Sequence, residues 1–501
     1  MGKGDRRILL LCADAARHIG TVEEHLQAFK KFSRNQVLLI DALAASRLRL
    51  DLSMFDAIVF HYSIVISLQA YLPDGFADQL AAFPGPKILF IQDEFRWVNR
   101  TMATAEKLGI SVIFTVVNAD LVRKIYRNPY FDRVRFEQTL TGFVPEHLIE
   151  RKVPNYVDRP LDVSYRARKL PGWCGSFALQ KWQIGERFLA DAPKHGLKCD
   201  IAMSEASRIY GERWIDFVAS SKATLGTESG ASFVDYTGEV HEVIDTFEAA
   251  NPDAQFEVVR ERFLEGRDGE VVIHVISPRC FEAACLRTLM ILYPGEYSGV
   301  LQAGRHYVPL APDHSNMEEV VLILRNPELA SEIIHNAYEE VAKAPVWTFR
   351  AFISHFDCVV DEVVPRRTAA SLSFHTIEQS VADAQKRIAE DAQRQAEDAR
   401  RQAAADAQRA ETERLESERR KLTASTGPKM RLVIWAQGAK NVVARLVRSC
   451  LPQWAARPLL ALGRSVDRPV KLILKRVLRG RNEAVSLDQR HQDHPQRVRS
   501  L

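Results

Sequence analysis

The first 150 residues alternate short, continuously apolar runs with longer stretches whose apolar residues recur every three or four positions. The five apolar runs are 8–12, 36–40, 57–61, 87–91 and 112–115. A strand buried on both faces has no polar side, so these runs predict central strands of a parallel sheet. The stretches between them, such as 22–32 and 68–83, predict helices that cover both faces. We therefore expect residues 1–155 to form a Rossmann-like α/β lobe.

A second lobe of the same class is predicted for residues 160–365. Its expected strands are 162–165, 222–226 and 288–293, and its expected helices are 184–190, 214–220, 281–286, 317–324 and 328–341. Ligands of parallel sheets bind beyond the carboxyl ends of the strands, and a cleft between two such lobes is a common small-molecule site. In the first lobe the residues that follow strands include Asp14, Arg17, His18, Gly20, His61, Tyr62, Gln92, Asp93 and Glu94.

The C-terminal quarter of the chain differs in composition from the two lobes. Residues 370–426 are rich in Ala, Gln, Glu and Arg, with neither Gly nor Pro from 376 to 426, which predicts one long helix, either a coiled coil or a spacer. Residues 429–501 carry 16 Lys and Arg against 4 Asp and Glu, so the tail has a net charge of +12 and the rest of the chain −8. Apolar residues recur at helical spacing from 432 to 450, which predicts a basic amphipathic helix. An anionic membrane surface, a partner protein, nucleic acid and a tail without a partner all remain open, with nucleic acid not expected because no aromatic residues interleave the charges.

Composition excludes several classes of protein. A hydrophobic fraction of 46% with 26% charged residues is ordinary for a globular protein and excludes a chain that is disordered throughout. The sequence has no run of 18 apolar residues free of charged ones, so no transmembrane helix is predicted. The N-terminal apolar run is too short to be the core of a signal peptide. The 7 cysteines show no zinc-binding spacing, which favours buried thiols in a reducing compartment. We expect a cytoplasmic protein, with peripheral attachment to the inner membrane face as an option.

The segment with the most chemical information is Ser277-Pro-Arg-Cys-Phe-Glu282-Ala-Ala-Cys-Leu-Arg-Thr-Leu-Met290. It places an arginine three residues before a glutamate, at the start of a short helix that leads into a strand. The segment resembles the donor-binding signature of two-lobed (GT-B fold) glycosyltransferases of the group-1 type, particularly the CgeB-like branch. The resemblance extends through Tyr293 to Glu319 and, more diffusely, over residues 5–345. It implies two Rossmann-like lobes, a nucleotide-diphosphate sugar as donor substrate and no other cofactor.

One position departs from that family pattern. The family has a second glutamate eight positions before the one that corresponds to Glu282, and this chain has His274 there. The role of the family's first glutamate is therefore open in this chain.

Glycosyl transfer from a nucleotide sugar requires positive groups that meet the leaving diphosphate. The chain has no Asp-x-Asp metal motif at the expected place, so Arg279 and Lys181 are the candidates for this role and no metal site is predicted. The resemblance gives Glu282 a role in binding the nucleotide ribose and places Ser277 and Ser298 in the substrate-binding segment. Glu228 lies in a small polar loop beside Gly230, where it is expected to bind a sugar hydroxyl.

Acid–base chemistry on the acceptor requires a carboxylate or a histidine from the first lobe, and His18 and Asp93 are the candidates. Arg208 and Trp214 are expected to line the cleft, with no mechanism assigned.

Together these features predict a metal-independent glycosyltransferase that acts on a glycan or glycolipid acceptor. Two alternatives stay open. One is a non-catalytic scaffold that binds glycans or nucleotide sugars, and the other is a nucleotide-sugar epimerase on the same fold.

Overall fold

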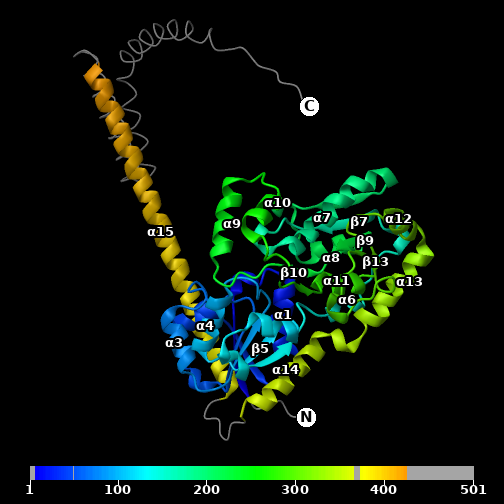
Figure 1. Cartoon of the computed structure of the whole chain (residues 1–501). Helices are drawn as coiled ribbons and strands as arrows, with labels where there is room; N and C mark the ends of the chain where they lie inside the picture. The colour runs from blue at the N-terminus through cyan, green and yellow to red at the C-terminus, as the bar shows by residue number, and fades with distance from the viewer. Residues whose placement is uncertain (1–5, 49, 366–372, 426–501) are drawn as a thin grey trace, which may run out of the picture. The chain divides into compact units, whose positions relative to one another are not determined.

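A computed structural model describes residues 6–48, 50–365 and 373–425, and divides the chain into two compact units, Met1–Arg387 and Ile388–Leu501. The first unit contains two α/β lobes (Figure 1). The N-terminal lobe has a six-stranded sheet in the order β2-β1-β3-β4-β5-β6, with every pair parallel. Its strands are β1 (Arg7–Cys12), β2 (Gln36–Asp41), β3 (Ala57–Phe60), β4 (Lys87–Ile91), β5 (Val112–Thr115) and β6 (Arg135–Gln138).

Helices cover both faces of this sheet, because its central strands are apolar on both sides. One face packs against α2 (Ala42–Leu48), α3 (Asp74–Ala82), α4 (Val98–Leu108) and α5 (Ala119–Ile125). The other packs against α1 (Gly20–Phe32) and α14 (Phe349–Val363). The short helix α6 (Glu146–Ile149) ends the lobe.

The C-terminal lobe has a five-stranded parallel sheet in the order β13-β12-β9-β7-β8. Its strands are β7 (Leu161–Arg166), β8 (Cys199–Ala202), β9 (Ser221–Gly226), β12 (Leu289–Leu292) and β13 (Val308–Pro309). One face packs against α7 (Ser176–Asp191), α12 (Met317–Arg325) and α13 (Pro327–Ala337). The other packs against α6, α8 (Glu212–Ala219) and α11 (Pro278–Cys285).

An insertion between β9 and α11 joins the two lobes. It consists of the antiparallel pair β10 (Ser229–Ala231) and β11 (Ile273–Val275) with α9 (Glu239–Ala250) and α10 (Phe256–Val259) between them. Residues of β11 pack into the core of the N-terminal lobe. Gly230 has a φ of +139°, and a Cβ there would lie 1.8 Å from the carbonyl oxygen of Ile273, so the close approach that this glycine permits is to the paired strand.

The chain returns to the N-terminal lobe through α14, whose residues fall within the predicted second lobe, 160–365, so that boundary is wrong at this end. The buried carboxylate of Asp357 on α14 accepts hydrogen bonds from Ser33 Oγ (2.6 Å), the Arg34 backbone N–H (2.7 Å) and Asn35 Nδ2 (2.9 Å). This carboxylate therefore fastens the returning helix to the turn between α1 and β2.

Replacing Asp357 with asparagine should lower the free energy of unfolding by about 1–3 kcal/mol, because an amide cannot accept all three hydrogen bonds and a donor is left without a partner. The chemical denaturation midpoint of the purified chain measures this. Glu362→Gln is the matched comparison: Glu362 is exposed on the same helix and pairs with Arg135 at the surface, so this change should lower the free energy of unfolding by less. An unchanged midpoint in Asp357→Asn would contradict the assigned role.

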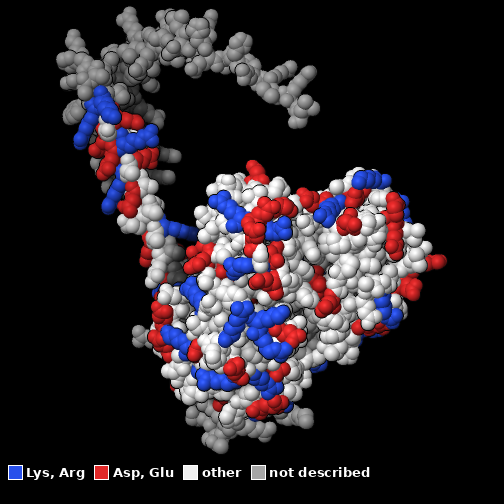
Figure 2. Space-filling model, in the orientation of Figure 1, with Lys and Arg blue, Asp and Glu red and all other residues white. Residues whose placement is uncertain are grey.

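The two predicted α/β lobes with parallel sheets are confirmed, and so is the long helix, α15 (Phe374–Ser425). Every strand predicted in the two lobes is present. To the two parallel sheets the structure adds β6, β8 and β13, which are edge strands and are short or polar, and it adds the separate pair β10 and β11. Figure 2 shows both acidic and basic side chains along the described part of α15.

Coiled-coil pairing of α15 stays a prediction, and the predicted basic helix in 429–501 lies outside the described residues. Among the described residues, no helix combines the length and the apolar character needed to cross a membrane.

Candidate functional site

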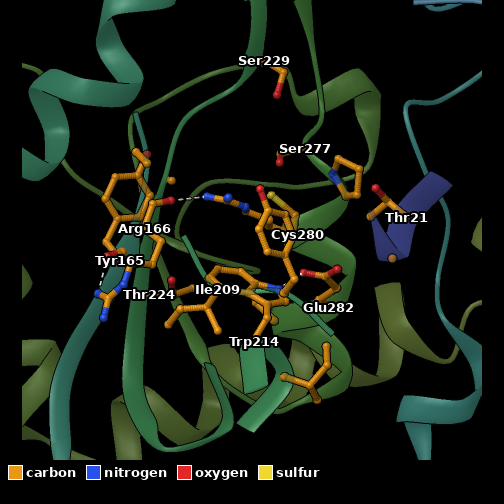
Figure 3. A pocket seen from close by; sticks show the side chains of 18 of the residues that line it. Thr21, Tyr165, Arg166, Ile209, Trp214, Thr224, Ser229, Ser277, Cys280 and Glu282 are labelled. Atoms are coloured by element: carbon orange, nitrogen blue, oxygen red, sulfur yellow. Dashed lines mark hydrogen bonds between the residues drawn. The ribbon is translucent and has the colours of Figure 1, made fainter. Parts of the chain in front are cut away.

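A cavity of about 510 Å³ lies between the two lobes, within the size range of small-molecule sites. The C-terminal lobe supplies the carboxyl ends of β7 and β9, the start of α8 and the N-terminal turn of α11. The N-terminal lobe supplies the start of α1, and His147 comes from α6, the helix that connects the two lobes. In Figure 3, Thr21 of α1 lies across the cavity from Tyr165 and Arg166 at the end of β7.

The N-terminus of α11 is formed by the local sequence. Ser277 is extended, with φ −82° and ψ 140°, and Pro278 occupies the first helical position, where its fixed φ suits the helix and its missing N–H costs nothing. The Ser277 side chain does not cap the helix. The Cys280 N–H donates to the backbone oxygen of Ser277 at 3.0 Å, and Ser277, Pro278 and Arg279 line the cavity at this helix end.

Five cationic side chains line the cavity: Arg166, Arg168, Lys181, Arg208 and Arg279. Two of them are paired with carboxylates, Arg166 with Asp200 at 2.8 Å and Arg208 with Glu205 at 2.6 Å. In the described part of the chain, the other three, Arg168, Lys181 and Arg279, have no carboxylate partner. The cavity thus contains three cationic side chains that form no salt bridge with a carboxylate of the described residues.

Lys181 lies on the first half of α7, and its Nζ donates to Ser229 Oγ at 2.7 Å. Burial, with a further contribution from the positive charge of Arg279, lowers the pKa of Lys181 to about 8. An anion bound in the cavity would reverse this effect, because it stabilises the ammonium form.

Trp214 and Glu282 lie together on one wall (Figure 3), and Arg279 contacts the Trp214 ring. The Trp214 Nε1–H donates to Glu282 Oε2 at 2.7 Å, and the Arg279 guanidinium lies over the indole, 4.7 Å from its ring centroid. Arg279 also donates to the backbone oxygen of Arg166 at the end of β7. These contacts hold the orientation of all three side chains.

Three carboxylates face the cavity: Glu24, Glu212 and Glu282. Glu212 is exposed and pairs with Arg151 at 2.8 Å. Burial raises the pKa of Glu282, although its hydrogen bond from Trp214 and the charge of Arg279 act in the opposite direction. Burial and the nearby Glu282 carboxylate raise the pKa of Glu24 to about 7.

Of the eight site residues predicted from the sequence, four line this cavity: Lys181, Ser277, Arg279 and Glu282. The two proposed acid–base residues do not. His18 is exposed, with its Nδ1 2.8 Å from the backbone oxygen of Ala15 and its ring 5.7 Å from that of Tyr210. Asp93 is exposed beside Arg96, whose Nη2 is 3.4 Å from its carboxylate.

Glu228 and Ser298 also lie outside the cavity lining. The Glu228 carboxylate is buried, accepts from the backbone N–H of Tyr297 at 2.7 Å and lies 3.3 Å from His274 Nδ1. Ser298 Oγ accepts from the backbone N–H of Ile276 at 3.1 Å. Glu228 thus binds the loop after β12 at Tyr297 and contacts His274 of β11, and Ser298 of that loop binds the chain just after β11 at Ile276.

The sequence analysis expected Arg208 and Trp214 to line the cleft, and both do. It did not single out Glu24, Arg166 or Arg168. The position of Arg166 and Arg168 at the end of the predicted strand 162–165 is the signal that identifies them, because ligands of parallel sheets bind there. No such signal separates Glu24 from its neighbour Glu23.

Within the ranges 6–48, 50–365 and 373–425, no group of three His, Cys, Asp or Glu side chains is arranged to hold a metal ion. Metal independence stays a prediction.

No protein-family model and no curated protein matches this chain. Solved structures similar to it include an α-glucosyltransferase in complex with UDP-glucose and DNA containing an abasic site (10% identity, TM-score 0.45, covering 71% of this chain and 100% of that one). HepE of Anabaena in complex with UDP-glucose is also similar (10% identity, TM-score 0.42, covering 71% of this chain and 100% of that one). A third is AviGT4, a glycosyltransferase involved in avilamycin A biosynthesis (12% identity, TM-score 0.35, covering 72% of this chain and 98% of that one). The expected absence of a nucleic-acid partner and the CgeB-like subtype both stay predictions.

Proposed function

We propose that this chain is a glycosyltransferase that moves a sugar from a nucleotide-diphosphate sugar to an acceptor hydroxyl. The observation that carries the proposal is the set of three cations without carboxylate partners, Arg168, Lys181 and Arg279, in one cavity between two α/β lobes. They lie near the carboxyl ends of parallel strands and near the N-terminal turn of α11, where phosphate groups bind in folds of this class.

The chemistry of the transfer suits this arrangement. The bond between the anomeric carbon and the diphosphate oxygen breaks, and the negative charge that develops on the leaving diphosphate must be stabilised. Arg279 offers a planar fork to two phosphate oxygens, and Lys181 offers a compact charge with its Nζ already oriented by Ser229. Arg168 is exposed at the same edge and adds a third charge.

Glu282 is the proposed partner of the nucleotide ribose. Its carboxylate has one hydrogen bond, from Trp214, so it retains accepting capacity toward ribose hydroxyls. The resemblance to group-1 glycosyltransferases assigns the same role to this position.

The acceptor is proposed to enter from the N-terminal lobe, where Ile19, Gly20, Thr21 and Glu24 line the cavity. A glycan or glycolipid hydroxyl is the proposed acceptor class. The basic tail predicted for 429–501 supports a lipid-linked acceptor at an anionic membrane, since positive segments bind such surfaces.

The proposal predicts which ligands stabilise the chain and what it releases. A panel of UDP-, dTDP-, GDP-, ADP- and CMP-sugars is tested by thermal denaturation, and we expect at least one diphosphate sugar to raise the melting temperature. The same sugar, incubated with the chain and a mixture of glycan and glycolipid acceptors, should release its nucleoside diphosphate. Isomerised donor would instead support an epimerase, and stabilisation without turnover would support a scaffold. No stabilisation by any member of the panel would contradict the proposal.

A further inference from the structure

Glu24 is the carboxylate that the N-terminal lobe contributes to the cavity lining. It lies on the second turn of α1, and its Oε1 is 3.8 Å from His147 Nε2, a distance too long for a hydrogen bond. The other two cavity carboxylates, Glu212 and Glu282, each accept a hydrogen bond from a protein side chain. Among the residues that the structure describes, Glu24 is therefore the cavity carboxylate without a hydrogen-bond partner.

The adjacent glutamate on α1 has the opposite environment. Glu23 accepts two hydrogen bonds from the Arg17 guanidinium, at 2.6 and 2.9 Å, and a third from Gln27 at 2.8 Å. The bonds from Arg17 are the main cause that lowers the pKa of Glu23, and this side chain does not line the cavity. One of two neighbouring carboxylates is thus neutralised by an arginine, and the other faces the cavity with both oxygens able to accept.

Glu24 and Glu282 face the same region of the cavity from opposite lobes. In Figure 3 the Glu282 carboxylate extends toward the side of the cavity where Thr21 of α1 lies. Burial raises the pKa of Glu24 to about 7, and the charge of Glu282 adds to this effect. Burial also raises the pKa of the Cys285 thiol on α11 to about 12, and the charges of both glutamates act in the same direction. Both carboxylates therefore lie near one stretch of α11.

The protein supplies few hydrogen-bond donors to these two carboxylates. The indole N–H of Trp214 donates to Glu282, and within the described ranges no lysine or arginine forms a salt bridge with Glu24. A carboxylate accepts hydrogen bonds and donates none, so the remaining donors must come from the ligand or from water. A neutral ligand group with two adjacent O–H donors, a vicinal diol, matches two carboxylates that face one region.

Resting on the proposed function, we propose that Glu24 and Glu282 bind the ribose of the donor between them, with one hydroxyl of its 2′,3′-diol donating to each carboxylate. Glu24 is then a specificity-determining residue for the nucleotide, and the donor is a ribonucleoside-diphosphate sugar. A hydroxyl that donates to a carboxylate forms a stronger bond than one that donates to a neutral acceptor. The first turn of α1, at Gly20 and Thr21, remains available to the acceptor.

The test uses the nucleoside diphosphate whose sugar stabilises the chain most, together with its 2′-deoxy and 3′-deoxy forms, in isothermal titration calorimetry. The parent chain should bind each deoxy form about 10–100-fold more weakly, because each form lacks one donor to a carboxylate. Glu24→Ala should lose the discrimination against one of the two deoxy forms and keep it against the other. Glu24→Gln, whose amide oxygen still accepts, should recover part of the lost discrimination.

Glu23→Ala is the matched control, because it removes the neighbouring carboxylate of the same helix outside the cavity, and it should keep both affinity ratios. The melting temperatures of the variants without ligand verify that they are folded.

Three results would overturn the inference. The first is a Glu24→Ala variant that discriminates against both deoxy forms as the parent does, and the second is a parent chain that binds all three nucleotides equally. The third is a dTDP-sugar as the most stabilising member of the panel, since it lacks the 2′-hydroxyl. Each of these leaves the proposed transfer reaction standing, whereas a panel in which no diphosphate sugar stabilises the parent contradicts that reaction and this role of Glu24 together.

Discussion

Exchanging Lys181 and Arg279 together for alanine should weaken the binding of UDP or another nucleoside diphosphate by about three orders of magnitude. A hydrogen bond to a charged group contributes about 1.5–3 kcal/mol, which corresponds to roughly 10–150-fold in affinity for each side chain. The two losses are expected to add incompletely, because both side chains face one ligand and the charge of Arg279 lowers the pKa of Lys181 in the empty cavity. Isothermal titration calorimetry on the parent, both single variants and the double variant measures the effect.

The same pair predicts a pH dependence. The ammonium form of Lys181 binds the diphosphate, and its pKa in the empty cavity is about 8, so the affinity should fall as the pH rises from 7 to 9. Binding near pH 8 should take up a proton, seen as a dependence of the measured heat on the buffer's ionisation enthalpy. Lys181→Arg, which stays charged throughout this range, should bind without that uptake.

Arg187→Ala is the matched control, since Arg187 lies on the same helix as Lys181 but is exposed and bonds the backbone oxygen of Pro312 outside the cavity. It should leave both the affinity and the proton uptake unchanged. A double variant of Lys181 and Arg279 that binds every nucleoside diphosphate as the parent does would remove the basis for the proposed donor site.

The fold could be predicted from the sequence where a strand is buried on both of its faces. The central strands of both lobes are apolar on both faces, and their positions follow from that pattern alone. β6 has the sequence Arg-Phe-Glu-Gln, with no fully buried position, and an edge strand of that kind has no apolar run to detect. The return of α14 to the first lobe could not be predicted either, because its apolar face fits any sheet and the contacts of Asp357 with residues 33–35 are long-range.

The site was partly predictable for a related reason. Ser277, Arg279 and Glu282 belong to one short segment, so their common place on the cavity wall follows from the start of a single helix. Glu228 lies in a segment whose neighbours Thr227 and Ser229 do line the cavity, and the alternation of side chains along an extended chain turns Glu228 away. The choice between Glu23 and Glu24 depends on the rotation of α1 about its axis relative to the other lobe, and no local pattern carries that information.

The second large effect concerns stability at the end of the C-terminal sheet opposite the cavity. Arg159 is 4% exposed, and no carboxylate neutralises it in the described part of the chain. Its guanidinium donates to the backbone oxygens of Ser221 (2.8 Å) and Leu286 (2.9 Å), to Thr288 Oγ1 (2.8 Å) and to Pro154 O (3.2 Å). One side chain thus joins the entry to the lobe, the start of β9 and the turn between α11 and β12.

Arg159→Ala should lower the free energy of unfolding by about 4 kcal/mol, because it leaves several buried acceptors without a donor, at about 1–3 kcal/mol each, and opens a void that water fills only in part. Arg159→Lys should recover a fraction of this loss, since an ammonium has three donors but lacks the fork that reaches four acceptors. Lys222→Ala, which breaks a half-buried pair with Asp162 at 2.8 Å on the same edge of the sheet, should cost about 1 kcal/mol or less. Because this edge lies away from the cavity, the folded fraction of Arg159→Ala should bind nucleoside diphosphate as the parent does. A denaturation midpoint of Arg159→Ala equal to that of Lys222→Ala would show that the buried guanidinium does not hold the lobe together.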